Sequence, residues 1–142
     1  MATSNAATTY LEHKILDFLF KNNSSSFATP GNSIYVGLAT AVSDAEAGSL
    51  TEATFGSYAR QQVTAANWTL ASASTDQQTV TNAANIEFPA STGTSNTVTH
   101  AFIVDAASSG NILFVGALDA NKTIATGDIF RINAGNLTIE LK

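Results

Sequence analysis

The sequence predicts a mainly β protein, an antiparallel β-sandwich or jelly-roll-like domain preceded by one N-terminal α-helix. Apolar residues recur at helical spacing only near the start of the 142-residue chain, and from residue 33 onward they recur at every second position. Short strand-like segments are separated by Gly, Asn, Ser and Asp, which is typical of antiparallel sandwiches. Given this length, we expect residues 1–142 to form a single domain, with the helix at 9–22 and the sandwich at 33–142.

The helix is predicted over "TTYLEHKILDFLFKNN". Thr9 and Glu12 have the spacing of a capping box, in which each residue satisfies a backbone N–H of the first turn. One face of the helix carries apolar residues at helical spacing, namely Leu11, Ile15, Phe18 and Leu19. Two asparagines and three serines then end the helix.

The apolar arc of this helix is wider than one core requires. Leu16 and Phe20 lie beside the main face and widen the arc to roughly 200°, whereas a surface helix that covers one core needs about 100°. We therefore expect the helix to contact two surfaces. The alternatives are that its own domain surrounds it, or that Phe20 is simply an exposed terminal residue.

The strands follow from alternation of apolar and polar residues. They are predicted at 33–40, 58–64, 79–88, 97–105, 111–119, 128–132 and 136–142, with weaker candidates at 68–71 and 122–126. In the last strand, one face is expected to carry Leu137, Ile139 and Leu141. In the strand that ends at Phe88, the residues expected to point inward are Ala84, Ile86 and Phe88.

The stretch 97–119 is apolar on both faces of both of its strands and therefore needs two covers. One face can meet the opposite sheet, and we expect the helix to cover the other, with Phe18 in the core. His100 and Asp105 point to opposite faces of a straight strand, so they are not expected to form a catalytic dyad. We interpret His100 as a hydrogen-bonded histidine near a strand end.

The longest stretch without a clear period is "AVSDAEAGSLTEATFGS" at 41–57, which contains Asp44, Glu46 and Glu52. An irregular segment of this length often makes contacts with a partner or closes over a site. The alternative is a mobile surface loop. Arg60, shortly after it, is expected to pair with Glu52 or with a neighbouring chain.

The composition excludes several classes of function. The net charge is −5 with only 6 Lys and Arg, so a basic face for nucleic acid is not expected. There is no cysteine and no apolar run of about 18 residues, so neither a thiolate site nor a membrane span is expected. Charged residues make up 12% of the chain, and a surface of Ser, Thr and Asn suits permanent protein contacts or simply reflects a threonine-rich β protein.

No catalytic, cofactor or metal motif is present. The segment 119–130 begins like a calcium loop, but Ile124 and Phe130 occupy the positions of the required Gly and Glu. Trp68, Tyr35 and Tyr58 could form a platform for a sugar, although packing within a core or an interface explains them better. We therefore expect no catalytic residue, no cofactor and no bound metal.

Across nearly its whole length the chain resembles a family of small tailed-bacteriophage virion proteins that are often labelled tail fibre proteins. The resemblance is carried in order by "YLEHKILDFLF", "YVGLAT", "GSYARQQV", Asn67-Trp68, "IEFP", "VTHAFIVDAASSGNILFVGAL", "KTIATGD" and "AGNLTIEL". It implies a non-enzymatic structural protein of the phage particle. The first hypothesis is a capsid cement or decoration protein that stabilises the shell. The alternatives are a tail fibre or baseplate component, or a carbohydrate-binding module for host attachment.

The expected partners are the major capsid protein or other virion proteins, together with further copies of the chain in a homotrimer, and neither nucleic acid nor membrane. The expected location is the outer capsid surface or, alternatively, the tail, after synthesis in the host cytoplasm. The residues predicted to contact other chains are Leu16, Phe20, Asp44, Glu46, Glu52 and Arg60.

Overall fold

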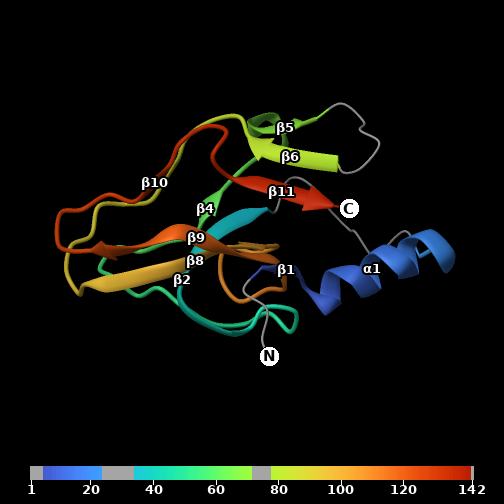
Figure 1. The fold of residues 1–142 in the computed structure, drawn as a ribbon, viewed down its shortest axis with the longest axis horizontal. Coiled ribbons are helices and arrows are strands. Elements are labelled where there is room, and N and C mark those ends of the chain that lie inside the picture. Colours follow the sequence, from blue (N-terminus) through green and yellow to red (C-terminus); the bar gives the residue numbers. More distant parts are fainter. Residues whose placement is uncertain (1–4, 24–33, 72–77, 142) are drawn as a thin grey trace.

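The computed structural model describes residues 5–23, 34–71 and 78–141. In these residues one α-helix, α1 (Thr9–Phe20), accompanies antiparallel strands (Figure 1). The largest sheet has six strands in the order β1-β9-β8-β2-β3, with β4 paired to β2. Its strands are β1 (Ala6–Ala7), β2 (Tyr35–Asp44), β3 (Ser49–Glu52), β4 (Gln61–Gln62), β8 (Asn96–Val104) and β9 (Ile112–Ile124).

Two smaller sheets pack against one face of the large sheet. One pairs β7 (Ile86–Glu87) with β10 (Arg131–Ile132), and the other has the order β11-β6-β5. The strands of the latter are β5 (Trp68–Leu70), which follows the short 3-10 turn Ala65–Asn67, β6 (Gln78–Asn82) and β11 (Thr138–Leu141). Buried side chains from both layers, among them Leu38 and Ile103 opposite Phe88 and Ile132, form the main core. The predicted β-sandwich with an N-terminal helix is therefore confirmed.

The second face of the β8–β9 hairpin is also buried, as its two-sided apolarity predicts. Phe102, Val104 and Val115 form a second cluster on that face. The cover comes from the β2–β3 hairpin, whose Ala45 is fully buried in the cluster. The expectation that the helix covers this face is wrong.

The segment 41–57 is not an irregular loop. Strand β2 continues to Asp44 and β3 returns along it, so this segment is largely a β-hairpin. In its turn, the carboxylate of Asp44 accepts the backbone N–H of Ala47 (3.1 Å), and Gly48 adopts a positive φ of 67°. Register shifts within the pair break the strict alternation of side chains, which explains why the sequence period does not reveal it.

Among the described residues, the first turn of helix α1 supplies its hydrogen bonds to the large sheet. Thr8, rather than the predicted Thr9, is the N-cap: its hydroxyl accepts the N–H of Leu11 (3.3 Å) and donates to the carbonyl of Ile112 (2.6 Å). Leu11 is the buried residue of the helix, and the rest extends away from the strands (Figure 1). Phe18 is 43% exposed, so its predicted place in the core is wrong. The helix leaves the body because β1, just before it, pairs with the outer edge of β9.

Several predicted strands have different limits. The segment 79–88 divides into β6 and β7, while 111–119 and 122–126 belong to the single strand β9. Only Gln61–Gln62 of 58–64 and only Arg131–Ile132 of 128–132 pair as strands. Ile86 and Phe88 are buried as predicted, but Ala84 is exposed because it lies in the bend between β6 and β7.

Gly37 is required by the packing of the second cluster. It lies directly opposite Phe102 across the β2–β8 pair, and a Cβ atom on Gly37 would overlap the Phe102 ring. We expect Gly37→Ala to lower the free energy of unfolding by about 1–3 kcal/mol, because the ring must move within a packed cluster. Urea denaturation measures this.

The matched control is Gly93→Ala, because a Cβ atom there meets nothing within 4 Å. This control should change the free energy of unfolding by less than about 0.5 kcal/mol. Equal midpoints and slopes for the two variants would contradict the role assigned to Gly37.

Candidate functional site

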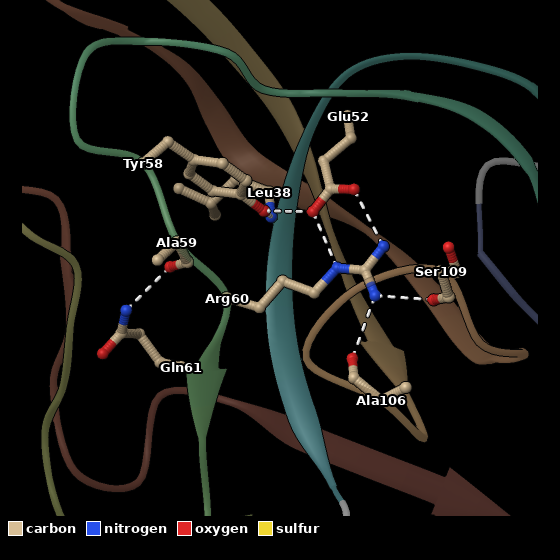
Figure 2. A network of polar contacts seen from close by, with 8 residues as sticks. All are labelled: Leu38, Glu52, Tyr58, Ala59, Arg60, Gln61, Ala106 and Ser109. Carbon is tan, nitrogen blue, oxygen red and sulfur yellow. Dashed lines mark hydrogen bonds and ion pairs between the residues drawn. The ribbon is translucent and has the colours of Figure 1, made fainter.

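A network centred on Arg60 is the most extensive set of polar side-chain contacts among the described residues (Figure 2). The guanidinium makes two parallel contacts with the carboxylate of Glu52, each 2.8 Å long, through Nε and Nη2. Its Nη1 donates to the backbone carbonyls of Ala106 (2.9 Å) and Ser109 (2.7 Å), in the turn between β8 and β9. Only 9% of the Arg60 side chain is exposed. Arg60 therefore ties β3 to the β8–β9 turn.

Tyr58 extends this network into the main core. Its phenol donates to Glu52 (2.8 Å) and accepts the backbone N–H of Leu38 (3.0 Å). Its ring stacks on Phe88 at a centroid distance of 6.1 Å. Burial, together with the hydrogen bond to the Glu52 carboxylate, raises the pKa of Tyr58 well above its usual range. Tyr58 therefore stays neutral and keeps donating its proton.

The contacts of Glu52 stabilise the charged form of its carboxyl group. Burial acts to raise the pKa of this carboxyl, but the hydrogen bonds from Arg60 and Tyr58 and the positive charge of Arg60 outweigh it, so the pKa lies below its ordinary value. The guanidinium of Arg60 also lies over the Phe102 ring, 5.4 Å from its centroid. With its nitrogens engaged inside the chain, this network acts as a structural clamp, and the described contacts provide no nucleophile or free base.

Two of the residues predicted to contact other chains, Glu52 and Arg60, are thus paired with each other, which is one of the two partnerships expected from the sequence. Asp44 ends β2, and Glu46 lies in the β2–β3 turn, where its carbonyl accepts the N–H of Thr9 (2.8 Å) at the base of α1. Leu16 and Phe20 lie on the projecting helix. Contact of these residues with another chain remains a prediction.

The Nδ1 of His100 is 2.7 Å from the hydroxyl of Thr99, which confirms the predicted hydrogen bond, but the predicted place near a strand end is wrong because His100 lies in the middle of β8. Its Nε2 is buried without a partner among the described residues. The carboxylate of Asp105 instead accepts two hydrogen bonds from Asn111 and closes the β8–β9 turn. The structure therefore shows no His–Asp dyad in this hairpin.

The three aromatic residues considered as a sugar platform are separate. Trp68 donates its indole N–H to the carbonyl of Val63 (3.2 Å) and packs against the main core, as Tyr58 does. Tyr35 packs against the second cluster. Their positions support packing rather than a carbohydrate site.

One feature that the sequence did not predict is a groove of about 540 Å³ between β9 and β11. It is lined on one side by Phe114, Gly116 and Leu118 and on the other by Leu137 and Ile139. The signal for it was Gly116, a glycine inside an otherwise apolar strand. In the described ranges there is neither a cluster of three potential metal-ligating side chains nor a helix with the length and apolarity of a membrane span.

The described residues form a β-sandwich with an internal ion-pair clamp and a helix that exposes several apolar side chains. A family model described as "Podophage GP4 fiber I protein gp80" matches residues 6–140. The chain belongs to this family of phage structural proteins, which confirms the resemblance drawn from the sequence. A comparison with curated proteins finds no match.

Two variants of Arg60 test the clamp. Arg60→Ala should lower the free energy of unfolding by about 3 kcal/mol, because it leaves a partly buried carboxylate and two carbonyls without their donor. Arg60→Lys should recover only part of this loss, because an ammonium cannot make the two parallel contacts. Urea denaturation at neutral pH gives both values. Losses below about 0.5 kcal/mol for both variants would show that the clamp does not stabilise the fold.

His100 should make stability depend on pH. Burial lowers its pKa from the ordinary value of 6.5, so below pH 6.5 the unfolded chain binds a proton that the folded chain does not. Stability should therefore fall as the pH decreases from 6.5, until the pH drops below the folded-state pKa. The free energy of unfolding of His100→Gln should vary less over this interval. Identical pH profiles of stability for the variant and the wild type would show that His100 is not the source of the pH dependence.

Proposed function

We propose that this protein is a fibre component of a short-tailed phage particle and acts as a structural rather than a catalytic protein. The observation that supports this most strongly is the family match over residues 6–140, whose description names a fibre protein. Among the functions expected from the sequence, this favours the tail fibre alternative over the capsid cement hypothesis.

The architecture is compatible with a role based on contacts. The polar side chains of the Arg60 clamp are satisfied within the chain, so they stabilise the fold without serving a substrate. By contrast, α1 presents Leu16 and Phe20, which are 56% and 77% exposed. Apolar side chains gathered on a surface mark sites of protein association. We propose that the partners are further copies of this chain, in a homotrimer, and other proteins of the particle.

Phage particles that carry an epitope-tagged copy of the protein test this proposal. We expect antibody label at the tail end of the particle, and a copy number far below that of the major capsid protein when the particle proteins are quantified by mass spectrometry. The matched control is a particle that carries the same tag on its major capsid protein. Label spread over the whole shell would support the cement hypothesis instead, and particles without the protein would contradict both.

A further inference from the structure

The groove between β9 and β11 is hollow because two small residues face each other in the large sheet. Gly116 pairs with Ala101 across the β8–β9 ladder, and both line the groove. A Cβ atom built on Gly116 meets nothing within 4 Å, so the described residues leave the space above this glycine open. Glycine in a strand often marks a place where another group approaches closely. The larger Phe114 and Leu118 bound the hollow along β9.

The same chain carries an apolar helix with little cover. Among the residues that the structure describes, five of the eight exposed large hydrophobic side chains belong to α1, and Phe20 is the most exposed of them at 77%. A helix of 12 residues is marginal by itself in water and usually depends on packing of its apolar face. The buried residue of α1 is Leu11 in its first turn, whereas Leu16 and Phe20 are 56% and 77% exposed.

Helix geometry directs the side chains of Leu16 and Phe20 away from the sheet of their own chain. At about 100° per residue, Leu16 and Phe20 lie roughly 140° and 180° around the axis from Leu11, which faces the chain's own sheet. The distance along the axis from Leu11 to Phe20 is roughly 14 Å. No residue of α1 lines the groove. With its first turn bound to Ile112 and Leu113, α1 does not fill the hollow of its own chain.

We infer that the groove of one copy receives Phe20 and Leu16 from helix α1 of a second copy. The two surfaces match in kind, because a projecting aromatic side chain with an apolar neighbour one turn away meets a hollow lined by Phe114, Leu118 and Ile139. They also match in charge, because Lys21 follows Phe20 directly, whereas the exposed Asp119 lies at the rim of the groove. A second copy of the chain can therefore supply the occupant of the groove.

This contact is head-to-tail, since a helix on one copy meets a different surface on the next. Such contacts form closed rings when the rotation between copies closes, and a trimer is the smallest ring with more than two copies. The inference specifies how copies would meet in the proposed fibre, but its test in solution does not require the particle.

The first experiment measures assembly of the full chain by sedimentation velocity over a range of concentrations. Phe20→Ser should weaken association at least about tenfold, as expected for a central interface residue. Gly116→Val should do the same by filling the groove, and it should still fold because a Cβ atom at this position meets nothing within 4 Å. Gly116→Ala adds a single methyl group and should give a smaller effect of the same sign.

Matched controls alter the same residue types elsewhere. Leu70→Ser removes another strongly exposed apolar side chain, and Gly93→Val adds atoms at another glycine with open space around it; neither position lines the groove. Both controls should associate like the wild type. Circular dichroism and thermal melting of each variant establish that the β-core is folded.

A mixing experiment separates this contact from helix-to-helix pairing. Phe20→Ser retains its groove, and Gly116→Val retains its helix. At a concentration where the wild type assembles but a tenfold weaker contact does not, each variant alone should be mainly monomeric, whereas an equimolar mixture should form a one-to-one complex that grows no further. If α1 paired with α1 instead, Gly116→Val alone would still associate and addition of Phe20→Ser would not increase its association.

Three outcomes would overturn the inference: a wild-type chain that is monomeric at all concentrations, a folded Gly116→Val variant that assembles like the wild type, or a mixture that stays monomeric. If Gly116→Val does not fold, the folded Gly116→Ala variant takes its place, and assembly of Gly116→Ala like the wild type counts against the groove in the same way. Failure of the proposed function appears separately, as absence of the tagged protein from the particle.

Discussion

The contact between Arg60 and Glu52 is the interaction on which much of the remaining arrangement depends. It joins the segment before β4 to β3, and through the carbonyls of Ala106 and Ser109 it also fixes the β8–β9 turn. The guanidinium covers the Phe102 ring on the second face of the sheet. A planar group with five donors suits this position, because no other cationic side chain can bind one carboxylate twice and reach two further carbonyls.

This clamp also determines where the helix leaves the body. Glu52 ends β3, so holding its carboxylate holds the β2–β3 hairpin against the sheet. The turn of that hairpin buries Ala45 and offers the carbonyl of Glu46 to the N–H of Thr9. The first turn of α1 is therefore fixed from two sides, by this turn and by β9. The hairpin covers the apolar face that the helix was expected to cover, which leaves the helix free to project.

The sequence predicts periodic features of single helices and strands well, but it predicts poorly which elements pack against each other. The helix, the two-sided hairpin and the inward positions of Ile86 and Phe88 follow from spacing alone, because side-chain direction is set by local geometry. The β2–β3 hairpin was not predicted, since its register shifts interrupt the alternation. The pairing of Arg60 with Glu52 could be predicted only as one of two alternatives, because the choice depends on how β3 folds back.

The groove between β9 and β11 likewise could not be predicted from the sequence. Gly116 and Ala101 are recognisable in the sequence as small residues, but their pairing across two strands becomes visible only with the register of β8 and β9. The wide apolar arc of the helix, by contrast, was visible from the start, because the positions of Leu16 and Phe20 around the axis depend on helical geometry alone. The chain thus places its charged clamp inside, where each partner comes from the same copy, and leaves apolar side chains outside. In the proposed contact between copies, polar groups that are satisfied within one chain would not need to be desolvated, so the exposed apolar side chains would drive association.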